Sequence, residues 1–159
     1  MLIARHEAAH AVMRKMCGLG PTSLLAGSEA GYCAGTGTYI TSEAALLIVL
    51  AGPLADVGYV FEWGDWEKSH SVDLSLAKQM IEENVLLRMK FCQSATPLVP
   101  LSPSEALKMQ LTRAGDMLLD HVELIEELAE MLVEHHGFLS AQEVGRCLAE
   151  VEERFNGQR

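Results

Sequence analysis

The sequence predicts an α+β fold that is mostly α-helical, with one small β-sheet or hairpin. Most of the chain repeats apolar residues at the spacing of a helix. A Gly-rich segment of small residues at 22–40 interrupts that pattern and contains Thr36–Ile40, the best strand candidate. A length of 159 residues with 49% apolar residues fits one globular domain over 1–159, large enough to bury a core.

The first half of the chain should contain two helices on either side of the Gly-rich segment. Neither Pro nor Gly interrupts Leu2–Met16, and Gly18 is placed to cap the end of that helix. Thr41 and Ser42 can cap the start of a second helix. Residues 44–59 are almost wholly apolar, so we expect them to form the central helix of the core.

The second half should consist of helices separated by short connections. Ser71 is expected to begin a helix that runs to about Cys92, and three prolines mark a connection at 96–103. Residues 104–136 carry a helical apolar stripe and form either one long helix or two consecutive ones. Ser140–Glu143 has the spacing of a capping box and should begin the last helix.

The composition excludes several classes of partner. A net charge of −10 argues against a nucleic-acid surface, because phosphate binding needs a basic face. The longest apolar stretch, 44–55, contains a Gly-Pro break and is too short to span a bilayer. The four cysteines are scattered and form no C-x-x-C pair, which favours reduced thiols in a cytoplasmic protein over a disulfide framework or a thiolate zinc site.

The five residues His6-Glu7-Ala8-Ala9-His10 spell H-E-x-x-H within the first predicted helix. Positions i and i+4 of a helix lie one above the other on the same face, so two imidazoles can bind one metal ion. Glu7 then stands beside the ion, where it can act on a water molecule. The motif therefore predicts a catalytic metal centre on this helix.

A catalytic zinc with two histidine ligands needs a third ligand from the protein. The longer signature H-E-x-x-H-x-x-G-x-x-H is absent, so the third ligand must come from a later segment. Spacing alone leaves Asp73, Asp56 and His70 as candidates. The late histidines at 121, 135 and 136 are more typical of helix ends, where a histidine is electrostatically favoured.

Four segments resemble, in the same order, the peptidase domain of the FtsH-type zinc metalloproteases. They are Arg5–Val12 (that family's H-E-A-G-H-A), Leu50–Asp56 (L-G-G-R-A-A-E), Ser71–Ala77 (S-N-D-L-x-x-A) and Leu118–Val144 (the C-terminal helices with an E-T-L-like turn). The chain departs from the family at Ala9, where glycine is usual, at Pro53, where arginine is usual, and at Asp56, where glutamate is usual.

The resemblance implies a zinc-dependent metalloendopeptidase that hydrolyses unfolded proteins or peptides. His6 and His10 would bind Zn²⁺ together with Asp73, which matches the family's third ligand, and Glu7 would be the catalytic base. Asp56 would orient a ligating histidine and is the alternative ligand. The 159 residues contain no phosphate loop of the Walker type and leave no room for an ATPase, so any unfoldase would be a separate partner.

One further hypothesis concerns the way in which a substrate binds. We expect Thr36–Ile40 either to offer an exposed edge to which an extended peptide adds as a further strand, or to belong to an ordinary internal hairpin. Two other functions stay open: a non-catalytic relative that acts as a binding or regulatory partner, and a zinc hydrolase of a non-peptide amide, because zinc, water and a carboxylate do not specify the acyl group.

Overall fold

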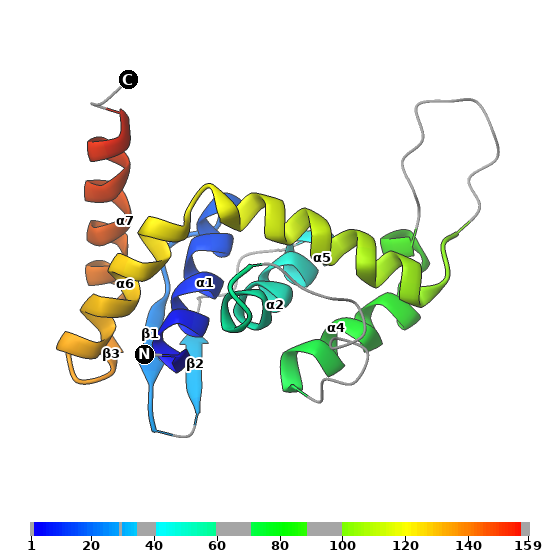
Figure 1. Cartoon of the computed structure of the whole chain (residues 1–159), viewed down its shortest axis with the longest axis horizontal. Helices are drawn as coiled ribbons and strands as arrows, with labels where there is room; N and C mark the ends of the chain where they lie inside the picture. The colour runs from blue at the N-terminus through cyan, green and yellow to red at the C-terminus, as the bar shows by residue number, and fades with distance from the viewer. Residues whose placement is uncertain (1, 29, 35–40, 60–70, 89–99, 157–159) are drawn as a thin grey trace.

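The computed structural model describes residues 2–28, 30–34, 41–59, 71–88 and 100–156. Within these ranges six α-helices accompany one three-stranded antiparallel sheet, as the sequence predicted. Helix α1 stands between the sheet on one side and helix α2 on the other (Figure 1). Helices α4 and α5 continue the molecule beyond α2, and α6 and α7 flank the sheet.

Helix α1 spans Leu2–Met16. Gly18, whose φ is +74°, terminates the helix as predicted. The amide of Gly18 donates to the Lys15 carbonyl at 2.9 Å, and the amide of Leu19 donates to the Arg14 carbonyl at 3.0 Å. This pair of bonds is a Schellman motif, in which glycine takes the left-handed conformation without a steric cost. Gly18 thus turns the chain away from α1 toward the sheet.

The sheet has the strand order β2-β1-β3, with β1 at Ser23–Ala26, β2 at Gly31–Ala34 and β3 at Phe138–Leu139. Both pairings are antiparallel. Leu24 and Leu139 lie opposite each other and are fully buried on the side that faces the core. The predicted strand at Thr36–Ile40 lies outside the described residues, and the short third strand was not expected from the sequence.

Helix α2 spans Ser42–Asp56, so it begins where the predicted cap at Thr41 or Ser42 placed it, directly before the apolar stretch 44–59. Thr41 is its N-cap, and its side chain accepts a hydrogen bond from the amide of Ala44 at 3.1 Å. The helix ends three residues earlier than predicted because Gly58 and Tyr59 take positive φ values of +73° and +66°, which a right-handed helix cannot accommodate.

Helix α4 spans Val72–Glu83, so the predicted extension to Cys92 is wrong. Asn84 is extended, and its side-chain oxygen accepts a hydrogen bond from the amide of Leu86 at 3.0 Å. A 3₁₀ turn, η1, follows at Val85–Arg88, and 89–92 lie outside the described residues. An asparagine side chain that bonds to nearby backbone competes with helix continuation, which accounts for the early end.

The C-terminal region contains three helices: α5 at Pro103–Leu119, α6 at Val122–Glu134 and α7 at Ala141–Asn156. The stretch 104–136 therefore forms two helices, with the chain direction changing at Asp120 and His121. The predicted capping box is present, since Ser140 Oγ accepts from the Glu143 amide at 3.3 Å and the Glu143 carboxylate accepts from the Ser140 amide at 2.8 Å.

A single hydrophobic cluster draws on all the helices and on β1 and β3. Its largest fully buried side chains include Met13, Leu50, Leu111 and Leu128. This core fixes α1, α2 and α4 relative to one another. Among the described helices, none has the length and hydropathy that a membrane span requires.

Leu128→Ala should lower the free energy of unfolding by about 2–5 kcal/mol, because Leu128 is fully buried in the core and its truncation leaves a cavity. Leu119→Ala is the control, since Leu119 is also helical but 49% exposed. Chemical denaturation of both variants measures the difference. Equal losses in the two variants would contradict the assignment of α6 to the core.

Candidate metal centre

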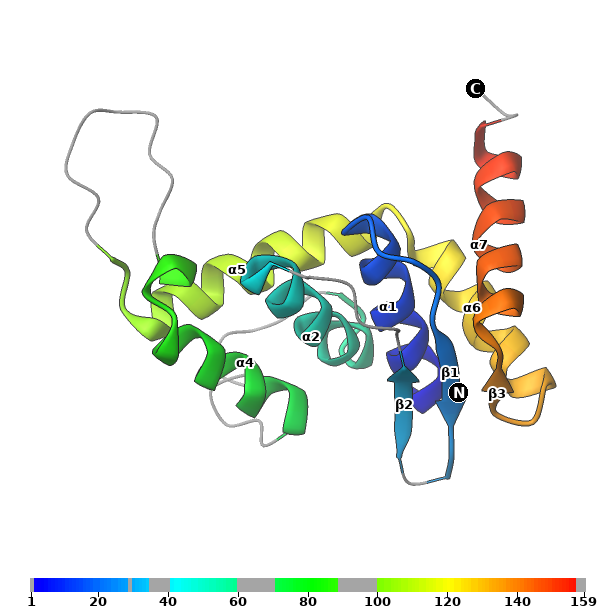
Figure 2. The ribbon, with the colours of Figure 1, turned by 180° about the vertical axis from the view of Figure 1, so that it is seen from behind.

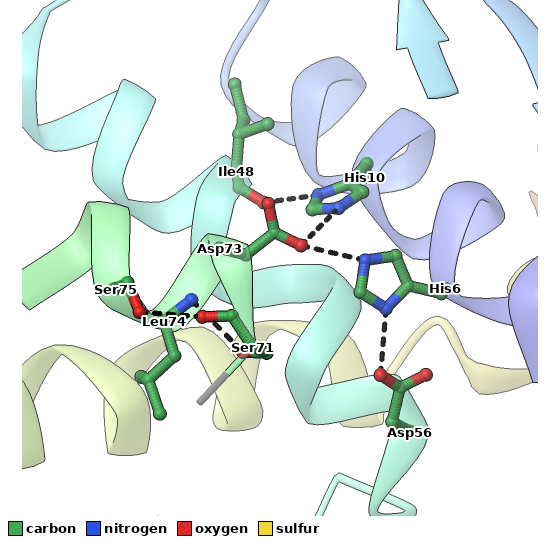
Figure 3. A network of polar contacts seen from close by, with 8 residues as sticks. All are labelled: His6, His10, Ile48, Asp56, Ser71, Asp73, Leu74 and Ser75. Atoms are coloured by element: carbon green, nitrogen blue, oxygen red, sulfur yellow. Dashed lines mark hydrogen bonds and ion pairs between the residues drawn. The ribbon is translucent and has the colours of Figure 1, made fainter. Parts of the chain in front are cut away.

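Helix α1 presents His6 and His10 one turn apart on the face that looks toward α2 and α4 (Figure 3). Their ring centroids are 4.8 Å apart, and the rings stand edge to face. His10 is 8% exposed and Glu7, which lies between them in the sequence, is 5% exposed. The H-E-x-x-H motif is therefore helical and largely buried.

Asp73 approaches the two histidines from the first turn of α4. Its Oδ2 atom lies 2.9 Å from His6 Nε2 and 3.6 Å from His10 Nε2. Ser71 fixes the start of this helix, because its hydroxyl oxygen accepts a hydrogen bond from the amide of Leu74 at 3.2 Å. Among the described residues, His6, His10 and Asp73 make up the group of side chains able to hold a metal ion.

The other nitrogen of each imidazole bonds to an acceptor on α2. Asp56 Oδ2 lies 2.9 Å from His6 Nδ1, and the Ile48 carbonyl oxygen lies 2.7 Å from His10 Nδ1. A backbone carbonyl can only accept, so His10 Nδ1 carries a proton and its Nε2 keeps a free lone pair when the ring is neutral. Asp56 has the same effect on His6 when its carboxylate is ionised. Both rings are thereby oriented with Nε2 toward Asp73.

Gly52 of α2 lies directly beneath the two Nε2 atoms. A Cβ atom built on Gly52 would overlap the Nε2 atoms of both His6 and His10, far inside van der Waals contact. The sequence alone assigns Gly52 no role of its own. The one indication in the sequence is that Gly52 lies inside an apolar helical run. A glycine is unfavourable at such a position unless packing requires it.

The three donor atoms suit a zinc ion. Tetrahedral zinc with bonds of about 2.0–2.1 Å places its donor atoms roughly 3.3–3.4 Å apart. The 2.9 Å and 3.6 Å separations from Asp73 Oδ2 to the two Nε2 atoms bracket that value, and all three donors lie within 4.8 Å of one another. Two imidazoles and one carboxylate also leave a fourth position open, as in catalytic zinc sites.

The electrostatics of the cluster favour a positive charge at the same point. Burial lowers the pKa of His6, but its hydrogen bonds with Asp56 and Asp73 outweigh that effect and raise the pKa to about 10. Burial raises the pKa of Asp73, but its interactions with His10 and His6 hold it well below the usual range. A site with two carboxylates around His6 is one that stabilises a cation.

Glu7 lies on the side of α1 that faces strand β2. Its carboxyl group packs against Gly31, where an added Cβ would lie 2.7 Å from Glu7 Cδ. Burial raises the pKa of Glu7, and the nearby His10 and His6 partly oppose that shift. The absence of a side chain at Gly31 therefore makes room for the carboxyl group next to the backbone of β2.

These residues share one open cleft of about 560 Å³. Its lining includes His6, Glu7, His10, Asp56 and Asp73, together with β2 residues at 31–33 and apolar side chains from α1, α2 and α4. The cleft therefore brings the predicted base and the predicted ligands into one chamber that is accessible from solvent.

Cys33 also lines this cleft, but it is not part of the metal-binding group. Burial raises the pKa of the Cys33 thiol to about 11, so this thiol is neutral near neutral pH. Its Sγ lies 3.7 Å from Thr22 Oγ1.

The other histidine candidates do not join the cluster. His135 Nδ1 lies 3.7 Å from a Glu143 carboxylate oxygen, and His121 Nδ1 lies 3.1 Å from the Met117 carbonyl oxygen. Both residues cap helix ends, as the sequence suggested. His70, one of the three candidates for the third ligand, lies outside the described residues.

Comparison with known proteins adds no family assignment. The sequence matches no protein-family model and no curated protein.

Gly52→Ala should weaken zinc binding by at least about tenfold, because the new methyl group would displace the Nε2 atoms of His6 and His10. Gly20→Ala is the control, since a Cβ at Gly20 would meet nothing within 4 Å. Isothermal titration with Zn²⁺ measures both affinities, and circular dichroism checks that both variants fold. Wild-type affinity in folded Gly52→Ala would show that this contact does not shape the site.

Asp56→Asn should reduce zinc affinity by about 10–100-fold, because the amide is a weaker hydrogen-bond acceptor for His6 Nδ1 than a carboxylate. Asp73→Asn should cause the larger loss, since it removes a charged ligand. Asp120→Asn, at an exposed helix end, is the neutral control. A larger loss in Asp56→Asn than in Asp73→Asn would reverse the roles of the two aspartates.

Proposed function

We propose that this chain is a zinc-dependent metalloendopeptidase that hydrolyses peptide bonds of unfolded proteins or peptides in the cytoplasm, similar to the peptidase domain of the FtsH-type proteases. One observation carries the proposal: His6 and His10 from α1 meet Asp73 from α4 in a cleft that also contains Glu7. Three of the four segments on which the resemblance rests contribute a side chain to this cleft.

His6, His10 and Asp73 would hold the zinc ion. When bound there, zinc supplies Lewis-acid chemistry, polarising a carbonyl group and lowering the pKa of a water molecule toward neutrality. Glu7 would accept the proton of that water and deliver it to the leaving amine. Asp56 and the Ile48 carbonyl would keep both imidazole rings in the tautomer that presents Nε2.

Strand β2 offers a way to hold an extended substrate. It is the outer strand of the described sheet on the side of the cleft, and Gly31 of this strand touches the side chain of Glu7. A peptide that adds to the outer edge of β2, which pairs with no other strand of the described residues, would lie across the cleft beside Glu7 and would be held mainly by main-chain hydrogen bonds. This arrangement supports broad sequence tolerance, with β2 in the role suggested for Thr36–Ile40.

The expected substrates are chains that are already unfolded. The sequence contains no phosphate loop of the Walker type, so this chain would not itself use ATP to unfold a protein. Folded substrates would first have to be unfolded, a step that a separate ATPase could supply. An unfolded substrate has no tertiary structure of its own that would keep a segment out of the cleft.

Glu7→Gln should lower the rate of casein hydrolysis without ATP by at least about 100-fold, because it removes the proton acceptor while leaving all three ligands in place. The zinc content should remain near one ion per chain. Glu130→Gln, an exposed glutamate on α6, should behave like wild type. Hydrolysis at the wild-type rate in Glu7→Gln would exclude Glu7 as the base.

The same assay separates the other functions. A zinc-loaded wild-type protein that cleaves small amides but not casein would be a hydrolase of non-peptide amides. A protein that binds zinc and cleaves neither would be a binding or regulatory relative, and the proposal would be wrong.

A further inference from the structure

The outward face of the β-sheet carries a row of exposed apolar side chains. Leu25 of β1 pairs with Tyr32 of β2 on one side and with Phe138 of β3 on the other. Residues directly opposite each other in a sheet point to the same face, so the three side chains form one continuous row. Their exposed fractions are 64% for Tyr32, 50% for Leu25 and 53% for Phe138.

An apolar row on the exposed face is unusual for a sheet that buries only its other face. The opposite face, with Leu24 and Leu139, is fully buried, and an outward face is then usually polar. Moreover, the residues of strands β1 and β2 are all uncharged, although the chain contains 34 charged residues (12 basic and 22 acidic). In Figure 2 the strands lie in front of α1, and none of the described helices crosses this face.

The row is continuous with the proposed active-site cleft, because Tyr32 both ends the row and lines the cleft. Two further apolar residues that line the cleft are also exposed, Leu2 at 58% and Val72 at 83%. Exposed apolar side chains therefore lie both along the cleft that contains the histidines and on the adjoining face of the sheet. A chain whose scissile bond lies beside Glu7 could extend from the cleft onto that face.

The size of the row favours an extended polypeptide over a second copy of this protein. A stable interface between two proteins needs about 800 Å² from each partner, which three half-exposed side chains do not provide. A flexible chain needs only a few apolar contacts in addition to those in the cleft.

We infer that Tyr32, Leu25 and Phe138 form a secondary binding surface for apolar segments of an unfolded polypeptide substrate. The inference rests on the proposed function and adds the substrate class: chains that expose apolar residues outside the scissile region. Folded proteins bury such residues, so the surface would select unfolded chains by the property that distinguishes them.

The test measures binding separately from catalysis. Reduced, carboxymethylated and fluorescently labelled casein is titrated with zinc-loaded Glu7→Gln protein, and anisotropy gives the Kd. Adding Leu25→Ser should raise the Kd about fivefold, and Phe138→Ser should do the same, because each removes a half-exposed apolar contact. Leu119→Ser is the matched control, a leucine with 49% exposure on α5, and should leave the Kd unchanged.

Three results would overturn the inference. The first is an unchanged Kd in both Leu25→Ser and Phe138→Ser, with folding checked by thermal unfolding. The second is an equal loss in Leu119→Ser, which would indicate unspecific apolar binding. The third is a concentration-dependent dimer of the wild type that Leu25→Ser abolishes, which would make the row a contact between copies.

Measurements of hydrolysis distinguish the secondary binding surface from the proposed peptidase function. With Glu7 intact, Leu25→Ser should lower kcat/KM for casein about fivefold relative to kcat/KM for a hexapeptide too short to reach the row. Casein that binds through the row without any cleavage would support the surface and refute the peptidase. Cleavage with an unchanged ratio would support the peptidase and refute the surface.

Discussion

The close contact between α1 and α2 at Gly52 is the constraint on which the candidate site depends. The backbone of α2 can pass beneath His6 and His10 only because Gly52 has no side chain. At that distance α2 supplies acceptors to both rings, from Asp56 at one end and from the Ile48 carbonyl at the other. One helix–helix contact therefore determines the position, the rotation and the tautomer of both histidines.

A different set of contacts positions Asp73 beside the two histidines. It lies in the first turn of α4, which Ser71 caps and which packs against α2 through the shared core. A carboxylate near a helix N-terminus is favoured by the helix dipole, so its placement there costs less than in the interior of a helix. The result is a cluster in which two carboxylates surround His6, and the electrostatic field favours a cation.

The sequence predicted the parts of the site that depend on local spacing. His6, Glu7 and His10 share one helix, so the geometry follows from the helical repeat. Spacing left Asp73, Asp56 and His70 as alternatives because none of them lies on that helix. Only packing shows that Asp73 contacts the Nε2 atoms while Asp56 contacts His6 Nδ1. The role of Gly52 could not be inferred, since it depends on which helix α2 contacts.

The same distinction holds for the fold. Capping by Gly18 and by Ser140 with Glu143 was predictable because each cap involves neighbouring residues. The end of α4 at Glu83 was missed because the apolar pattern continues beyond it, while the Asn84 side chain diverts the backbone. Strand β3 was not predicted because two residues are too few to show an alternating pattern.

X-ray absorption at the zinc edge of the zinc-loaded protein is the most direct test of the central claim, that two histidines and one aspartate form a four-coordinate site. The spectrum should show two imidazoles and oxygen donors, all at about 2.0–2.1 Å, with four ligands in total. Sulfur scattering at about 2.3 Å would instead place a cysteine on the metal, and a six-coordinate oxygen shell without imidazole would remove the histidines from it. Either result would contradict the site described for this chain.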